Sequence, residues 1–104
     1  MSQRYSNRPS CEVWCFPEEL PPRVVLRGDI DITANLQLEA AYQKLEPLAP
    51  SDVVLDLAEV TFLGCSALRL VVALTARLSP TGHKVTLRSP SLPARRLLEL
   101  AEFL

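Results

Sequence analysis

The pattern of apolar and polar positions divides the chain into short strands and amphipathic helices. Residues 53–57 (VVLDL) form a nearly unbroken apolar run with β-branched residues, which is typical of a strand buried on both faces of a parallel sheet. Shorter β-prone runs at 13–16 (VWCF), 23–27 (RVVLR) and 84–88 (KVTLR) predict three further strands. Prolines follow the first of these, which places it at an edge, and Gly28 closes the second.

Three helices are predicted between and after these strands. In residues 34–45 the apolar side chains recur at helical spacing, with Thr33 as a plausible N-cap. Residues 66–78 are apolar almost all round, which indicates a well-buried helix. Ser91 can cap a last helix with Pro93 in its first turn. The inner stripes of the first and last helices are Leu38, Ala41, Tyr42 and Leu45, and Ala94, Leu97, Leu98 and Ala101.

The predicted order of elements is β-β-α-β-α-β-α, which indicates one α/β domain. Strands that alternate with helices form a mostly parallel sheet with right-handed crossovers, here of four strands and three helices. With 104 residues the chain has room for a single core. Residues 1–10 are polar and predict a flexible tail, so the domain is expected over 11–104.

Composition and charge exclude several classes of function. The formal net charge is -1 and the basic residues are scattered, so the sequence has no electrostatic footprint for nucleic acid or for an anionic membrane. No apolar run is long enough to span a bilayer, and the first ten residues lack the apolar segment of a signal peptide. We therefore expect a cytoplasmic protein whose three cysteines are reduced thiols.

The sequence offers little for catalysis. Its one histidine, His83, lies in a turn before a strand and is expected to be solvated. Cys11 and Cys15 supply only two metal ligands, and a structural zinc needs four. The glycines are too far apart for a phosphate-binding loop, and Asp29 and Asp31, two residues apart after a strand, are not expected to share a proton as a catalytic pair. We expect a protein that is not an enzyme and that holds no metal or cofactor.

One junction could still carry a modification. Residues 54–68 run from the buried strand through a short loop into the N-terminus of the buried helix. Such a junction presents unpaired backbone N–H groups and the positive end of the helix dipole, which stabilise a phosphate. Ser66, in the first turn, can therefore be read either as a plain helix cap or as a phosphate acceptor.

Several motifs together resemble the STAS domain of anti-sigma factor antagonists. In that family a Gly-Asp/Glu-Leu/Ile-Asp stretch precedes the first helix, and residues 28–31 (GDID) match it. Asp56-Leu57 and residues 60–63 (VTFL) match the family's lead-in to its next helix. Residues 89–90 (SP) and 95–100 (RRLLEL) are similar to its last strand-to-helix stretch, so the resemblance covers about residues 23–104.

The family's switch motif is altered in this chain. Where the family has Asp-Ser-Ser/Thr-Gly, this sequence has Gly64, Cys65, Ser66 and Ala67. The phosphorylated hydroxyl of the family falls on Ser66 and is kept. The carboxylate before it is replaced by Gly64 and the other hydroxyl by Cys65.

The resemblance implies a regulatory module that binds a protein partner. The implied partner is an anti-sigma factor of the kinase-like, ATP-binding type, so that binding releases a sigma factor for transcription. The implied contact corner consists of Asp31, Thr33, Gly64, Cys65 and Ser66, with Arg69 and Val72 at its edge. A phosphate on Ser66 would block docking by its charge and bulk.

Three further interpretations stay open. A stripe of Arg69, Ala73 and Arg77, flanked by Val72 and Ala76, suits a closely docked partner helix or is ordinary surface. The altered switch motif favours a STAS scaffold that assembles a signalling complex without phosphorylation. From another class, Cys65 near a helix N-terminus could serve as a thiol redox sensor, with Cys11 or Cys15 as resolving partner.

Overall fold

The computed structural model describes residues 11–104 and confirms the predicted order of elements. The predicted flexible tail, residues 1–10, lies outside the described residues. The strands are β1 (Cys11–Phe16), β2 (Arg23–Ile30), β3 (Val53–Leu63) and β4 (Val85–Arg88), and the α-helices are α1 (Asn35–Leu45), α2 (Cys65–Leu78) and α3 (Leu92–Leu100). Two 3-10 turns, η1 (Ile32–Ala34) and η2 (Ser79–Thr81), precede α1 and follow α2.

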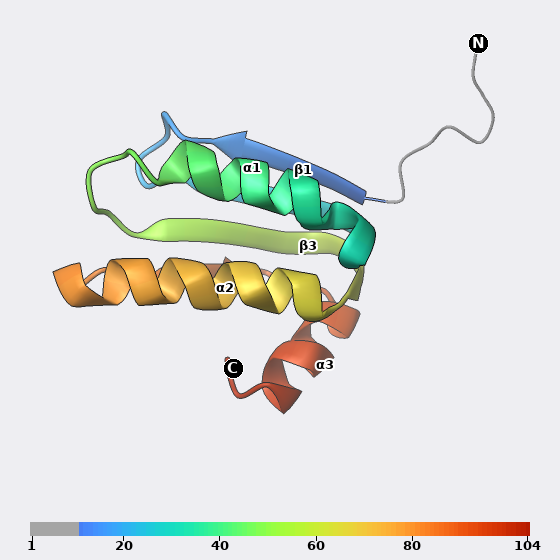
Figure 1. Ribbon diagram of the computed structural model, residues 1–104. Coiled ribbons are helices and arrows are strands. Elements are labelled where there is room, and N and C mark those ends of the chain that lie inside the picture. Colours follow the sequence, from blue (N-terminus) through green and yellow to red (C-terminus); the bar gives the residue numbers. More distant parts are fainter. Residues whose placement is uncertain (1–10) are drawn as a thin grey trace, which may run out of the picture.

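The strands form one mixed sheet in the order β1-β2-β3-β4. β1 runs antiparallel to β2, whereas β2, β3 and β4 are parallel to one another. The predicted central position of residues 53–57 and the edge position of the first strand are therefore both confirmed. Figure 1 shows α1 and α2 side by side over one face of the sheet, with α3 below α2.

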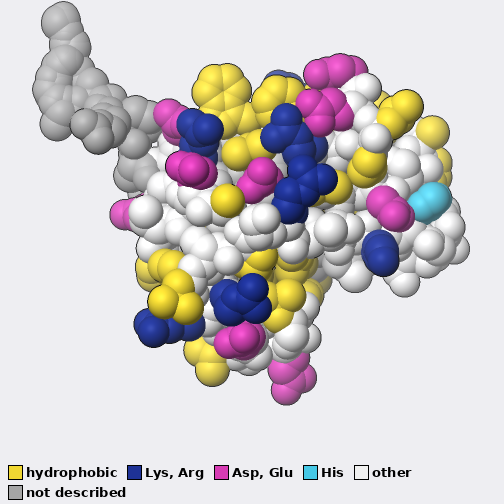
Figure 2. All heavy atoms as spheres, turned by 180° about the vertical axis from the view of Figure 1, so that it is seen from behind, with side chains coloured by type: hydrophobic (Ala, Val, Ile, Leu, Met, Phe, Trp, Pro, Cys, Tyr) yellow, Lys and Arg dark blue, Asp and Glu magenta, His cyan; other side chains and the backbone are white. Residues whose placement is uncertain are grey.

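The core lies between this sheet face and the two helices. Val24 and Leu26 of β2 and Leu55 and Leu57 of β3 are at most 1% exposed, and Leu74 of α2 is fully buried. Alternate residues of β1 and β2 point to the opposite face, which neither α1 nor α2 covers. Figure 2 shows that opposite face, where hydrophobic side chains lie among Arg or Lys and acidic side chains.

Strands β2 and β3 end later than the sequence predicted, whereas β1 begins two residues earlier and β4 one residue later than predicted. Gly28 does not close the second strand, because β2 continues to Ile30. Gly28 has a φ of 80°, and the register between β2 and β3 shifts on either side of it. A positive φ is a conformation that glycine adopts at little cost, so here the residue marks an irregularity inside a strand. β3 likewise continues six residues past Leu57, to Leu63.

Two of the three proposed helix caps are corrected by the structure. Asp31 caps η1 through its side chain, and Thr33 lies inside that turn, so Thr33 is not the N-cap. The N-cap of α2 is Gly64, which places Ser66 at the second helical position, where it does not act as the cap. Ser91 is confirmed as the N-cap of α3, since its side chain accepts a hydrogen bond from the backbone N–H of Ala94.

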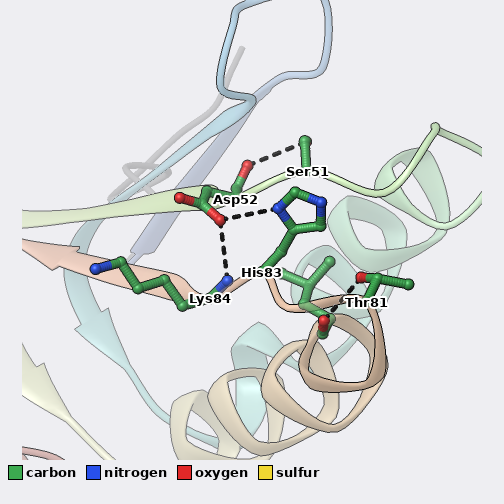
Figure 3. Close-up of polar contacts among 6 residues, drawn as sticks. Ser51, Asp52, Thr81, His83 and Lys84 are labelled. Atoms are coloured by element: carbon green, nitrogen blue, oxygen red, sulfur yellow. Dashed lines mark hydrogen bonds and ion pairs between the residues drawn. The ribbon is translucent and has the colours of Figure 1, made fainter.

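The one histidine joins the starts of β3 and β4. His83 Nδ1 lies 3.2 Å from Asp52 Oδ1, and the same carboxylate oxygen accepts a hydrogen bond from the backbone N–H of Lys84 at 3.0 Å (Figure 3). His83 is therefore a half-buried partner of Asp52 rather than a fully solvated turn residue. The Lys84 hydrogen bond and the nearby His83 hold the pKa of Asp52 below its usual value.

Candidate partner-docking site

The predicted contact corner is built where β2 and β3 end and α2 begins. The backbone N–H of Gly64 donates to the carbonyl of Ile30 at 2.8 Å, which joins the two strand ends. The Asp31 carboxylate accepts hydrogen bonds from the backbone N–H of Thr33 at 2.9 Å and from its hydroxyl at 2.6 Å. These hydrogen bonds stabilise the ionised carboxylate and hold the pKa of Asp31 below its usual value.

A hollow of about 300 Å³ opens at this corner and contains most of the predicted contact residues. It is lined by Asp31, Ile32, Asn35, Phe62, Gly64, Cys65, Ser66 and Arg69. Five of the seven predicted residues are thus in one place. Thr33 and Val72 do not line the hollow. Thr33 is hydrogen-bonded to Asp31, which does line it, and Val72 lies about one helical turn beyond Arg69 in α2.

A second hollow, of about 320 Å³, lies between α1 and α2. It is lined by Asn35, Leu38, Glu39, Tyr42, Ser66, Arg69, Leu70 and Ala73. The two hollows share Asn35, Ser66 and Arg69, so they form one continuous surface, which we call the α1–α2 groove. Ser66 lies at the point where its two halves meet.

Large apolar side chains stand exposed on this side of the molecule. Ile32 and Leu36 are 74% and 81% exposed, and Phe62 and Val72 are about half exposed. Ile32 and Phe62 line the corner hollow itself. Exposed apolar side chains next to a groove are typical of protein interaction surfaces. The sequence analysis missed Ile32, Leu36 and Phe62, although Leu36 lies off the buried stripe of its helix and so could have been identified.

The start of α2 has no side-chain cap. Gly64 supplies none, and the Ser66 side chain is half-buried at the second helical position. A Cβ at residue 64 would come within 3.2 Å of the Phe62 ring and 3.3 Å of the Ile30 carbonyl oxygen. The glycine therefore lets the Phe62 ring pack closely over this corner, where a larger residue would push it aside.

The basic stripe predicted along α2 is not a uniform surface. Arg69 is exposed, but the Arg77 guanidinium donates to the carbonyls of Leu45 and Leu48, at 3.0 and 3.4 Å, and to that of Glu46. Arg77 thus caps the C-terminal end of α1 and fastens the two helices together. Of the two arginines, only Arg69 is available to meet a partner.

The three thiols differ in their surroundings. Cys65 is exposed at the first position of α2, whereas Cys11 is buried and Cys15 is half-buried in β1. Burial raises the pKa of both β1 thiols, and Asp31 and Asp29 raise that of Cys11 further. Four residues of extended strand separate Cys11 from Cys15 by roughly 13 Å, too far for a disulfide between them.

Between residues 11 and 104, no group of three or more His, Cys, Asp or Glu side chains is placed to hold a metal ion. Over the same range no helix has both the length and the apolar character needed to cross a membrane.

Comparison with known proteins decides the family. The family model described as "Mlab, STAS domain" matches residues 18–103. The chain belongs to the STAS domain family. The resemblance inferred from the sequence is therefore confirmed, and the four-stranded α/β architecture agrees with the STAS fold. STAS domains commonly mediate interactions between proteins. No curated protein matches this STAS domain by sequence.

Proposed function

We propose that this STAS domain is a regulatory binding module whose docking surface is the α1–α2 groove. The observation that supports this best is the coincidence of three features on one side of the molecule. The groove is continuous, large apolar side chains such as Ile32 and Phe62 stand exposed beside it, and Ser66 lies at its centre. The domain acts by binding and not by catalysis.

The proposed partner is an anti-sigma factor of the kinase-like, ATP-binding type. Binding would withdraw that factor from its sigma factor and so regulate transcription. The argument for this partner is the match of residues 28–31 and 60–63 to the motifs of anti-sigma factor antagonists. The retained hydroxyl of Ser66 would be the phosphorylation site, because a phosphate there would stand in the groove and bring a double negative charge to it.

A second candidate is a STAS scaffold that uses the same groove without phosphorylation. Its support is the altered motif, in which Gly64 and Cys65 replace the carboxylate and hydroxyl that precede the acceptor. The description of the matched family names a STAS domain and no sigma-factor pathway. Both candidates predict docking in the groove, and they differ only at Ser66.

Calorimetric titration against the organism's purified kinase-like anti-sigma factors separates the candidates. For the phosphorylation switch, Ser66→Glu should weaken binding by about 1 to 3 kcal/mol, because a partner that docks on the neutral hydroxyl has no cation opposite the new charge, which must then be desolvated. Ser66→Ala should bind as the wild type does, since Ser66 is not the helix cap. Equal affinities of the wild type and Ser66→Glu would contradict the switch.

A second pair of variants tests the groove itself. Ala73→Arg places a long side chain in the groove and should abolish binding under either candidate. Thr75→Arg adds the same side chain to an exposed position of α2 outside the groove and serves as the control. Binding that survives Ala73→Arg would show that the partner docks elsewhere.

A further inference from the structure

The sheet face turned away from α1 and α2 carries an ordered pattern of side chains on its outer two strands. The register of β1 and β2 pairs Phe16 with Arg23, Trp14 with Val25, and Glu12 with Arg27. Trp14 is 52% exposed, although it lies in the middle of a strand. The middle pair is thus apolar, and each outer pair contains an arginine.

The charged groups of these pairs are only partly engaged within the molecule. The Arg23 guanidinium stacks 4.5 Å from the centre of the Phe16 ring and is bound by Glu19. Glu12 Oε1 lies 3.3 Å from the indole nitrogen of Trp14 and 3.8 Å from Arg27 Nη1. The Glu12 and Arg27 side chains are both about half exposed, so each can meet a further group.

Within the part of the chain that the structure describes, β1 is also an edge strand of the sheet. Within residues 11–104 it pairs on one side only, with β2. Edge strands commonly avoid further pairing through lysine, proline or a bulge inside the strand. β1 has none of these in its six residues, and Pro17 follows directly after its end.

We propose that a second copy of this chain pairs with β1, antiparallel and about a two-fold axis at Trp14, so that two sheets become one. In this register Trp14 faces Trp14 of the second copy, and Glu12 faces the second copy's Phe16. Pairing would end at the second copy's Pro17, which lies opposite Cys11 and has no N–H to donate. The inference goes beyond the proposed function, because it concerns a different surface.

Charge complementarity selects a second copy as the occupant and selects this register. Across the four central strands of the joined sheet, each outer row of side chains would consist of Arg27, Glu12, and then Phe16 and Arg23 of the second copy. Glu12 would therefore lie between Arg27 and the guanidinium that stacks on the second copy's Phe16. The two-fold axis produces this row twice, on either side of an apolar centre formed by two tryptophans and two Val25 side chains. Centring the pairing on Val13 would instead place Glu12 opposite Trp14 and lose the second guanidinium.

Sedimentation velocity of the full chain over a range of concentrations tests the proposal. The wild type should pass from monomer to dimer as its concentration rises. Trp14 is the one tryptophan in the chain, so its emission should shift to shorter wavelength over the same range. Trp14→Lys should weaken the dimer about tenfold or more, because two ammonium groups would meet at the axis. Leu100→Lys, at an 82% exposed position of α3, should leave the dimer unchanged.

A mixing experiment with two charge variants identifies the second copy directly. Glu12→Arg alone places three arginines in each outer row, and Arg23→Glu alone places two glutamates there, so each variant should be monomeric. When the two variants are mixed, one outer row keeps the wild-type charges, and in the other the arginine introduced at position 12 is matched by the glutamate introduced at position 23 of the second copy. The mixture should therefore form a heterodimer.

A wild type that stays monomeric at millimolar concentration would overturn the proposal. A dimer that Trp14→Lys leaves intact would overturn it as well, because the interface would then lie elsewhere. A mixture of the two charge variants that fails to associate would contradict the row of alternating charges. None of these results bears on docking in the α1–α2 groove, so the two proposals stand or fall separately.

Discussion

At the scale of single residues, two arginines on one face of α2 have different tasks. Arg69 and Arg77 are eight residues apart, and the sequence pattern assigns both to the same basic stripe. The structure gives Arg77 three carbonyl acceptors at the end of α1, whereas Arg69 stays exposed beside Ser66. A carbonyl cluster at a helix end cannot be read from the spacing of α2, so sequence analysis could not separate the two residues.

We predict that Arg77→Ala lowers the free energy of unfolding by about 1 to 3 kcal/mol, on the scale of hydrogen bonds to a charged group. Arg69→Ala should change it by less than about 0.5 kcal/mol, because that side chain is exposed. Urea denaturation at neutral pH measures both. Equal losses in the two variants would show that Arg77 does not fasten α1 to α2.

At the scale of elements, the first half of the central strand β3, residues 53–57, was the easiest segment to predict from the sequence. Its second half, residues 58–63, was the hardest. The run at residues 53–57 is apolar because it is buried in the middle of the sheet. Beyond it, the register with β2 shifts twice, so Ala58, Glu59 and Thr61 are exposed and interrupt the pattern. The prediction of the cap before α1 was wrong for another reason. Asp31 and Thr33 both offer a capping oxygen, and spacing alone does not choose between them.

The link between the starts of β3 and β4 should appear in the pH dependence of stability. Because folding lowers the pKa of Asp52 from 3.8, its stabilising effect is complete above that value and is lost as the pH falls through the lower folded pKa. We predict that Asp52→Asn is less stable than the wild type at pH 6. The difference should shrink as the pH falls below about 4. Urea denaturation across this range measures it, and a gap that stays constant with pH would contradict the role of the carboxylate.

At the scale of the whole molecule, the two faces of the sheet differ in what covers them. One face holds the core, α1, α2 and the groove. The other carries Trp14 of β1 and the arginines Arg23 and Arg27 of β2. The layered arrangement and the corner at Ser66 could be predicted, because apolar periodicity and the GDID and VTFL motifs report them. The groove could not be predicted, because it depends on how α1 packs beside α2. The side-chain pairs of β1 and β2 could not be predicted either, because they depend on the register of the two strands.

The three thiols differ in exposure, and this difference can be measured in solution. We predict that one thiol of the folded protein reacts rapidly with Ellman's reagent and that Cys65→Ser removes this rapid phase. Cys11 should react only after unfolding, because it is buried, and Cys15 should react slowly because burial raises its pKa. All three should react in urea. A rapid phase that persists in Cys65→Ser would mean that β1 opens readily.

The hydrogen bond from the backbone N–H of Gly64 to the carbonyl of Ile30 has a consequence for how this corner can change over evolutionary time. It joins β2 to the start of α2 through main-chain atoms, so the position of the corner does not depend on which side chains occupy residues 65 and 66. Substitutions there can alter what is recognised while the backbone stays where it was. With Cys65 and Ser66 at these two positions, the chain can therefore keep the backbone of the corner while presenting different side chains to a partner.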